Sequence, residues 1–265
     1  MRARLDVEIV RRGLAHSRES ARRMILAGHV RVNSRPAAKA DLAVDPTSRI
    51  EVFERAETYA SRGSYKLLAA LDHFALDPRG RLALDVGASS GGFTDVLLRR
   101  GAASVIALDV GYGQLSMKLR SDPRVIVRER TNIRYVQPKD LPFAPDLATI
   151  DVSFISLRLV LPAVLGLMER RAEIVALIKP QFEVGKHHVG KGGVVREERL
   201  RSEARDSVLH FARTLGLQIA GTMESPLAGP KGNREFLALM RWEDDTVGSV
   251  TPGSAILRTV TPPNP

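Results

Sequence analysis

The sequence of 265 residues contains no cysteine. A chain without thiols cannot form disulfides, cannot bind zinc or iron–sulfur clusters through cysteine, and cannot use a thiol as a nucleophile. The absence also fits a reducing compartment, and we expect the protein to be cytoplasmic.

Long uncharged apolar runs are missing too. The opening residues, MRARLDVEIVRRG, are charged where a secretory signal needs an uncharged apolar core. The longest apolar stretch, Ile155 to Met168, contains Arg158 and Pro162 and is shorter than the ~20 residues that cross a bilayer. We therefore expect no membrane partner, and a haemolytic or pore-forming protein is an alternative without a visible insertion segment.

Lysine is scarce, at 8 residues against 32 arginines, yet the chain has a formal net charge of +10. Residues 1–55 hold half of that excess, +5, in about a fifth of the chain. A basic balance of this kind favours a polyanionic partner, either nucleic acid or an anionic membrane surface. Arginine suits forked contacts with phosphates, although a GC-rich genome would also raise its share.

Residues 1–55 have the pattern of a small domain with two helices and short strands. Leu5, Ile9 and Val10 form a helical stripe that ends near Gly13. Ser17 is suited to cap a second helix. We expect that helix to end at Gly28 and to turn its apolar residues inward, namely Ala21, Met24, Ile25 and Leu26. The strands HVRVN and RIEVF follow. The basic outer face either contacts phosphates or is an ordinary solvated surface.

From Ser17 to Asn33 the sequence follows the passage S-R-x-x-A-x-x-x-I-x-x-G-x-V-x-V-N. Through this passage, about the first 52 residues resemble the S-four type RNA-binding domain, which is named after a ribosomal protein. The resemblance implies RNA contact through the basic helix and the turn that follows it. The arginines that we expect to take part are Arg4, Arg18, Arg22, Arg23 and Arg31.

From residue 64 to residue 243, short apolar segments alternate with amphipathic ones. LALDV, SVIALDV, LATID, EIVALI and EFLALMRW are typical of buried strands, with helical segments such as FTDVLLRRG between them. This alternation predicts an α/β domain with a parallel, doubly wound, Rossmann-like sheet. Residues 56–63 are expected to form a linker, and residues 244–265, rich in Pro, Thr, Gly and Ser, a flexible tail.

A glycine turn follows the first of these strands, in LALDVGASSGGF. Gly87 permits a tight turn, and the glycine pair that leads into the next helix lets the backbone approach a ligand. Ligands of open α/β sheets bind beyond the carboxyl ends of the strands, where Asp109 would reach a ribose diol. Ala88 replaces the second glycine of the dinucleotide motif, and the carboxylate of Asp85 suits a cationic ligand better than a pyrophosphate. The pattern therefore favours S-adenosylmethionine, whereas a turn needed only for packing is the plain alternative.

A second glycine pattern, GKHHVGKG at residues 185–192, resembles a phosphate-binding P-loop but has Gly192 where the loop needs a hydroxyl residue. His187 and His188 are adjacent rather than four residues apart, so we expect no metal site and no metal requirement. A mobile basic loop that covers substrate is the better interpretation.

Three polar residues lie at predicted strand ends, on the same edge as the glycine turn. Asp151 ends LATID, Lys179 follows EIVALI, and Glu235 opens EFLALM. Lys66, in the helix before the first strand, would join them. Strand ends are often polar merely because they meet water, but together these residues form a candidate site for methyl transfer to a hydroxyl. A lysine acts as the base only if its pKa falls below ~10.4, and positioning supplies much of the rate.

The motifs SRGSYKL, LDVGASSGGFTDVLL, TIDVSFISL, IKPQFEVG and GPKGNREFLAL are similar to those of the TlyA-type proteins, over residues 1 to about 242. Members of this family carry haemolysin names but act as ribosomal RNA methyltransferases with an FtsJ-like catalytic domain. The resemblance implies transfer of a methyl group from S-adenosylmethionine to a cytidine ribose 2′-hydroxyl, with ribosomal RNA or ribosomal subunits as the partner. It implies that Lys179 accepts the proton within a catalytic tetrad of Lys66, Asp151, Lys179 and Glu235. It also implies cofactor contacts from Asp85, Gly87, Ser89, Gly91, Gly92, Phe93, Asp109 and Asn132.

Two points stay open in this interpretation. Some members have a tryptophan-containing interdomain tetrapeptide where this chain has residues Glu57 to Ala60, so a role of the linker in cofactor binding is uncertain. An RNA-binding protein with an inert methyltransferase fold is an alternative besides the haemolysin. The sequence distinguishes neither the target nucleotide, nor the ribosomal subunit, nor the oligomeric state.

Overall fold

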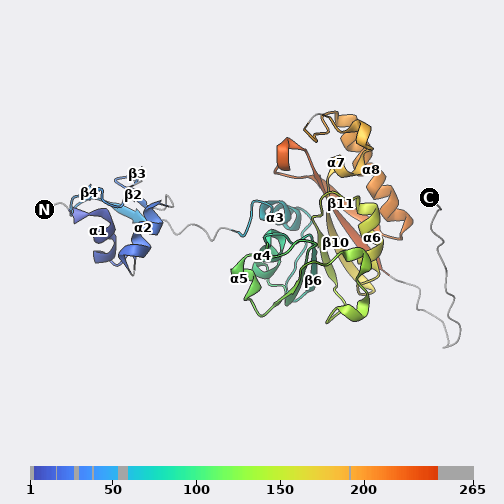
Figure 1. Cartoon of the computed structure of the whole chain (residues 1–265), viewed down its shortest axis with the longest axis horizontal. Coiled ribbons are helices and arrows are strands. Elements are labelled where there is room, and N and C mark those ends of the chain that lie inside the picture. Colours follow the sequence, from blue (N-terminus) through green and yellow to red (C-terminus); the bar gives the residue numbers. More distant parts are fainter. Residues whose placement is uncertain are drawn as a thin grey trace. The chain divides into compact units, whose positions relative to one another are not determined.

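The computed structural model describes residues 3–15, 17–26, 30–37, 39–52, 59–190 and 192–243 (Figure 1). By its internal contacts the chain divides into two compact units, Met1–Thr58 and Tyr59–Pro265. This division falls within the linker expected at residues 56–63. The tail expected at residues 244–265 lies outside the described residues.

The small unit packs two helices against short antiparallel strands. The helices are α1 (Leu5–Arg11) and α2 (Arg18–Leu26), and the strands are β1 (Ala3–Arg4), β2 (Val30–Val32), β3 (Arg35–Pro36), β4 (Ala43–Val44) and β5 (Ile50–Val52). Strands β3, β2 and β5 form one sheet in that order, and β1 pairs with β4. Both expected helices are confirmed, as are β2 and β5. The other three strands are only two residues long and leave no alternating pattern in the sequence.

Apolar residues from both helices and from the strands form the core of the small unit. Its buried helical side chains are Leu5, Ile9, Ala21 and Ile25, with Met24 packed on them. The second helix begins where expected, because Ser17 Oγ accepts a hydrogen bond from the Ser20 N–H at 3.1 Å. Gly28, which we expected to end this helix, lies outside the described residues.

The large unit contains a seven-stranded sheet in the order β11-β12-β10-β9-β6-β7-β8 (Figure 1). The strands are β6 (Leu82–Val86), β7 (Ser104–Leu108), β8 (Val125–Arg128), β9 (Leu147–Ile150), β10 (Arg171–Ile178), β11 (Gln218–Glu224) and β12 (Phe236–Glu243). The helices are α3 (Ser64–His73), α4 (Gly92–Arg99), α5 (Met117–Arg120), α6 (Leu157–Leu165), α7 (Pro180–Glu183) and α8 (Glu198–Thr214). Four single 3-10 turns complete the unit: Ile133–Tyr135, Pro138–Asp140, Lys186–His188 and Pro230–Gly232.

Helices cover both faces of this sheet, which explains why its strands are continuous apolar runs rather than alternating ones. In β10, Ile174 and Ala176 belong to the core cluster that contains residues of α6 and α8. Val175 and Leu177 belong to the cluster that contains residues of α3, α4 and α5. The Rossmann-like α/β architecture predicted from the sequence is therefore confirmed.

One strand runs against the others, so the predicted parallel sheet is a mixed one. Strands β10, β9, β6, β7 and β8 are parallel to one another, but β12 pairs antiparallel with both β10 and β11. The reason lies in the connection. Residues 225–235 join β11 to β12 without a crossover helix, and a link of that kind returns the chain antiparallel beside the strand that it left.

We predict that Ile25→Ala destabilises the small unit by about 2–5 kcal/mol, because it opens a cavity in a core with few other buried side chains. The large unit has two clusters of its own and should keep its stability. Hydrogen exchange in increasing urea, read by mass spectrometry, would follow each unit separately. An equal loss of protection throughout the chain would contradict the domain division that we predicted.

Candidate active site

The polar residues predicted at strand ends lie along one edge of the large unit's sheet. The chain proceeds from β6 to β7 and β8, then returns to β9 on the other side of β6. Loops diverge at such a reversal of strand order and leave a crevice at the carboxyl ends. The register aligns those ends, because Val86 is level with both Leu108 and Ile150, and Ile150 is level with Ala176.

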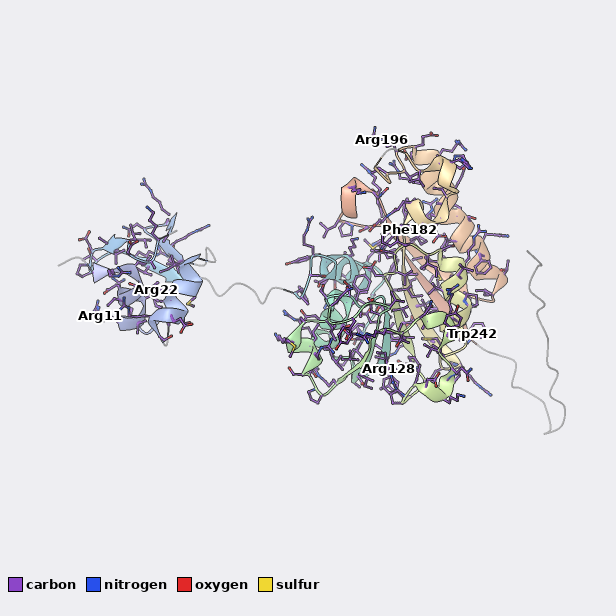
Figure 2. The ribbon with its side chains drawn as sticks, in the orientation of Figure 1. Arg11, Arg22, Arg128, Phe182, Arg196 and Trp242 are labelled. Atoms are coloured by element: carbon purple, nitrogen blue, oxygen red, sulfur yellow. The ribbon has the colours of Figure 1, made fainter. Side chains whose placement is uncertain are left out.

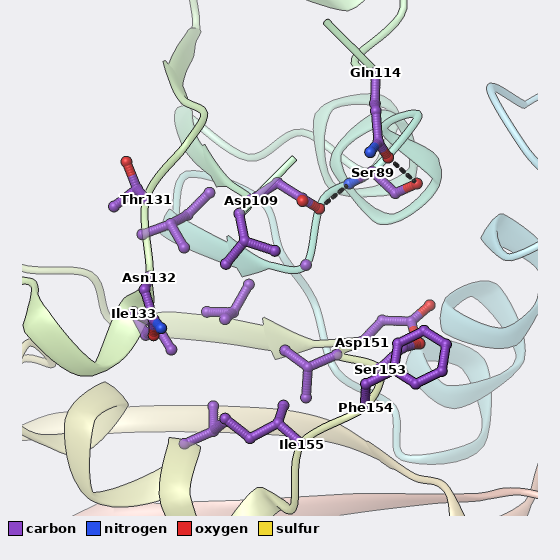
Figure 3. Close-up of a pocket in the computed structure, with 16 residues that line it drawn as sticks. Ser89, Asp109, Gln114, Thr131, Asn132, Ile133, Asp151, Ser153, Phe154 and Ile155 are labelled. Carbon is purple, nitrogen blue, oxygen red and sulfur yellow. Dashed lines mark hydrogen bonds between the residues drawn. The ribbon is translucent and has the colours of Figure 1, made fainter. Parts of the chain in front are cut away.

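A cavity of about 450 Å³ opens at this edge (Figure 3). Much of its lining is apolar, and its polar groups come from the loops that follow β6, β7, β8 and β9. The polar lining residues are Ser89, Asp109, Gln114, Thr131, Asn132, Asp151 and Ser153. An apolar cavity of this size with a few polar groups is typical of a small-molecule site.

The turn after β6 and the acidic residue after β7 face this cavity. Gly87 has a left-handed φ of 86°, and a Cβ there would overlap with the Asp151 carbonyl oxygen, so only glycine fits. Asp109 is held by two backbone donors: the N–H group of Ser89 at 2.8 Å (Figure 3) and that of Gly111 at 2.7 Å. A carboxylate accepts more than two hydrogen bonds, so Asp109 keeps capacity for a ribose hydroxyl.

A second cavity, of about 300 Å³, adjoins the first and shares Gly87, Ser89 and Asp151 with it. Its remaining lining comes from the start of α4 and from the segment before α3: Ser61, Arg62, Gly63, Ala88, Ser90, Gly92 and Phe93. The two cavities therefore meet at the glycine turn, because residues of this turn line both of them. A ligand longer than one cavity has space to continue into the other.

Tyr59 and Ala60, which we expected in the linker, are the first residues of the large unit and contact its helix α4. The Ala60 N–H donates to Asp95 Oδ2 at 2.9 Å, and the Arg99 guanidinium lies 4.4 Å from the centre of the Tyr59 ring. Both partners belong to α4, whose first turn leads out of the glycine loop. Glu57 and Thr58 lie outside the described residues.

Asp85, expected among the cofactor residues, lines neither cavity. Its side chain is fully buried, and its two oxygens accept hydrogen bonds from Thr94 Oγ1 at 2.7 Å and Thr149 Oγ1 at 2.9 Å. Burial raises the pKa of Asp85 to about 6, although these two hydrogen bonds oppose the shift. Asp85 thus ties β6 to β9 and α4 beneath the glycine turn.

The four residues of the expected tetrad form two lysine–carboxylate pairs. Lys179 Nζ lies 2.6 Å from Asp151 Oδ1 and donates to Ser153 Oγ at 2.9 Å. Lys66 Nζ donates to Glu235 Oε2 at 2.5 Å, and Glu235 is fully buried. Glu235 Oε1 is buried as well and has no hydrogen-bond partner among the described residues. Each ammonium therefore has a carboxylate partner in a setting largely closed to water.

Of the other expected cofactor residues, some line a cavity and one supports the loop from behind. Asn132 lines the larger cavity while its Oδ1 accepts from the Arg134 N–H at 3.1 Å. Phe93 lines the smaller cavity and is 3% exposed. Gly91 has a φ of 94° and packs on leucine side chains, so it supports the loop without lining either cavity.

One residue at the cavity was missed by the sequence interpretation. Phe154 lines the larger cavity, yet its side chain is 90% exposed and its φ is 64°. Its ring centre lies 5.1 Å from that of Phe182 in α7. The sequence could have indicated this residue by its position, because a large aromatic side chain stands only three places after the aspartate that ends the strand.

On the small unit, one buried carboxylate gathers three of the arginines expected to contact RNA. Asp6 is fully buried and pairs with Arg4 at 3.0 Å, Arg18 at 3.3 Å and Arg22 at 3.1 Å (Figure 2 labels Arg22). The hydrogen bonds from these guanidinium groups hold the pKa of Asp6 well below its usual range, and the largest contribution comes from Arg4. One carboxylate cannot neutralise three cations, so net positive charge remains on this face. The side chains of the three arginines are each about half exposed. Arg31 is exposed in β2, and the Arg23 side chain is outside the described set.

Among the described residues, no group of three or more histidine, aspartate and glutamate side chains is placed to hold a metal ion. In the same ranges, no helix is long and apolar enough to cross a membrane. His187 and His188 are exposed in the short 3-10 turn after α7.

The strand order, the glycine turn and the acidic residue after β7 define a Rossmann-like methyltransferase. The family model described as FtsJ-like methyltransferase matches residues 59–242, and that of the S4 domain matches residues 3–50. The "16S/23S rRNA (cytidine-2'-O)-methyltransferase TlyA" of Mycobacterium tuberculosis is 51% identical, over 92% of this chain and 91% of the relative. The chain therefore belongs to the TlyA family of FtsJ-like methyltransferases.

Two further relatives match this chain over most of their length. "Hemolysin A" of Brachyspira hyodysenteriae is 37% identical over 89% of this chain and 98% of the relative. A solved structure from Streptococcus thermophilus is 41% identical, covers 92% of this chain and 89% of its own, and superposes with a TM-score of 0.70. The family resemblance found in the sequence is thereby confirmed.

The raised pKa of Asp85 predicts a pH dependence of stability. Because its folded pKa of about 6 lies above the ordinary value of 3.8, the folded protein holds an extra proton between these pH values. The stability that this group contributes is therefore greatest below about pH 4 and falls as the pH rises through about 6, by on the order of 2–3 kcal/mol. Asp85→Asn should remove this part of the pH dependence.

Urea unfolding of the wild type and of Asp85→Asn, compared between about pH 4 and about pH 8, measures the effect. All other titrations cancel in the difference between the two free energies of unfolding. A difference that stays constant over this range would show that the Asp85 carboxyl is not perturbed by burial.

Proposed function

We propose that the protein transfers a methyl group from S-adenosylmethionine to the 2′-hydroxyl of a cytidine in ribosomal RNA. The observation that carries the proposal is the presence of two lysine–carboxylate pairs at one sheet edge, where Asp151 of one pair also lines the cavity. It is supported by the 51% identical relative whose name gives this reaction.

The cavity residues fit this cofactor. We assign the ribose of the cofactor to Asp109, whose carboxylate is already oriented by two backbone N–H groups. The apolar lining beside Asn132 and Ile133 suits the adenine ring. The methionine end would continue past Gly87 into the smaller cavity, which Gly87 also lines.

The chain's own residues would handle the proton of the attacking hydroxyl. When bound, S-adenosylmethionine supplies a methyl group on a sulfonium that is open to in-line attack. We assign acceptance of the ribose proton to Lys179 in its neutral form, because Asp151 and Ser153 fix its Nζ from two directions.

We assign the first contact with RNA to the arginine face on the small unit. Arg4, Arg18 and Arg22 converge on Asp6 with an excess of positive charge, which suits phosphate oxygens. At the other site, the exposed ring of Phe154 offers a surface on which a base can stack. The two units thus supply different parts of RNA recognition, one through charge and one at the reacting nucleotide.

Replacing Lys179 should abolish methyl transfer while leaving the cofactor cavity intact. We expect both Lys179→Ala and Lys179→Arg to lower kcat by about 10²-fold or more, because a general base contributes that much and arginine does not release its proton. A tritium-transfer assay on unmodified ribosomal subunits measures the loss, and calorimetry measures cofactor binding. The exposed Lys139→Ala is the matched control.

Full activity of either Lys179 variant would remove this residue from the mechanism. The same assay separates an enzyme from an inert methyltransferase fold, since the latter gives no transfer with the wild type. Lysis of liposomes by the purified protein alone would instead support the haemolysin interpretation.

Removing two arginines of the Asp6 cluster should weaken RNA binding in a salt-dependent way. For Arg18→Ala with Arg22→Ala, we expect the slope of log K against log salt to fall by about 1–2, because each lost phosphate contact removes roughly one unit. The control is Arg199→Ala with Arg213→Ala on the exposed side of α8, which removes the same charge. Equal slopes for the two double variants would place RNA binding elsewhere.

A further inference from the structure

The glycine-rich segment between α7 and α8 forms a closed turn whose own hydrogen bonds are few. The Gly190 N–H donates to the Val194 carbonyl at 3.1 Å, and the Gly193 N–H donates to the Gly190 carbonyl at 3.0 Å. Gly192 and Gly193 both have a positive φ and contribute no side chain to the packing of this turn. A turn of this kind needs support from elsewhere to keep one conformation.

Among the described residues, Asn233, in the connection between β11 and β12, supplies side-chain hydrogen bonds to this turn. Asn233 is 3% exposed. Its Nδ2 donates to the Gly193 carbonyl at 2.8 Å, and its Oδ1 accepts from the Val195 N–H at 3.0 Å. The amide therefore satisfies one acceptor and one donor of the turn, as a neighbouring strand would.

The same connection ends at Glu235, the predicted catalytic glutamate, and packs against its carboxylate. The Asn233 carbonyl accepts from the Gly229 N–H at 2.8 Å, and a Cβ on Gly229 would overlap with the carboxylate of Glu235. Glu235 follows two residues later and is fully buried in its pair with Lys66. Asn233 thus lies between the glycine-rich turn and the strand end that carries one tetrad residue.

The turn lies apart from both cavities assigned to the cofactor. All lining residues of those cavities fall between Ser61 and Val160. The exposed residues beside the turn include His187, His188 and Lys231, and the Lys231 Nζ lies 4.0 Å from the place of a Cβ on Gly193. An exposed backbone turn with a cation beside it suits a phosphate-bearing substrate better than the cofactor.

We infer that Asn233 is a positioning residue that clips residues 192–195 of the turn to the Glu235 strand end. RNA that binds to the turn would then be held at a fixed position relative to the proposed tetrad. This inference rests on the proposed function. Loss of the clip should affect the RNA substrate and leave the cofactor site unchanged, because no residue of the clip lines a cofactor cavity.

The test compares Asn233→Ala and the milder Asn233→Ser with a control in the same connection. The control is Ser225→Ala, which removes one side-chain hydrogen bond, to the Leu227 carbonyl, without touching the turn. For both Asn233 variants we expect kcat/KM for unmodified ribosomal subunits to fall by about tenfold to hundredfold. The Kd for S-adenosylmethionine should stay within about twofold of the wild type, and Ser225→Ala should resemble the wild type in both.

A second measurement follows the clip without relying on catalysis. Hydrogen exchange at the Val195 N–H should become about tenfold faster or more in the Asn233 variants, since it loses its acceptor. If wild-type protein methylates no ribosomal subunit, the proposed function fails while exchange still reports the clip. If the wild type is active and the Asn233 variants keep its kcat and KM, or if cofactor affinity falls with activity, the positioning role is overturned.

Discussion

The register of one mixed sheet determines where the polar groups of the site lie. Asp151 follows β9, Lys179 follows β10, and Glu235 precedes β12, which are neighbouring strands in that order. Because β12 runs against β10, its first residue, Phe236, lies level with the last residue of β10, Ile178, so Glu235 and Lys179 follow at the same edge. The reversed strand therefore brings a carboxylate to an edge that parallel strands reach only with their last residues. Side chains on adjacent strand ends are within reach of one another without any long loop.

The two lysine–carboxylate pairs have a consequence for experiments on this site. The side chains of Lys66 and Lys179 are each 9% exposed, and their partners are buried or mostly so. A charge in such a place is costly unless its partner remains. Removal of one tetrad residue therefore also leaves an unpaired charge behind, and loss of activity alone does not identify the base. A variant that keeps the charge, such as Lys179→Arg, separates the two effects.

The sequence predicted local features well and the relations between distant segments only in part. Apolar runs such as LALDV and EIVALI predicted buried strands, because a sheet covered on both faces leaves no polar side on its strands. The edge shared by Asp151, Lys179 and Glu235 followed from strand ends alone. The pairing of Lys66 with Glu235, 169 positions apart, is a matter of tertiary packing that no local pattern contains. The burial of Asp85 was hidden for the same reason, since Thr149 lies on another strand.

The contact between Gly87 and Asp151 limits how this enzyme family can diverge. The turn that faces the cavity we assign to the cofactor and the strand end that carries Asp151 meet backbone to backbone, with no space for a side chain on Gly87. Under the proposed function, a mutation that alters the shape of the turn would also move the Asp151 backbone, so cofactor fit and ribose positioning are coupled at this contact. New substrate ranges are therefore more accessible through changes on the RNA-facing surfaces, which leave this contact untouched.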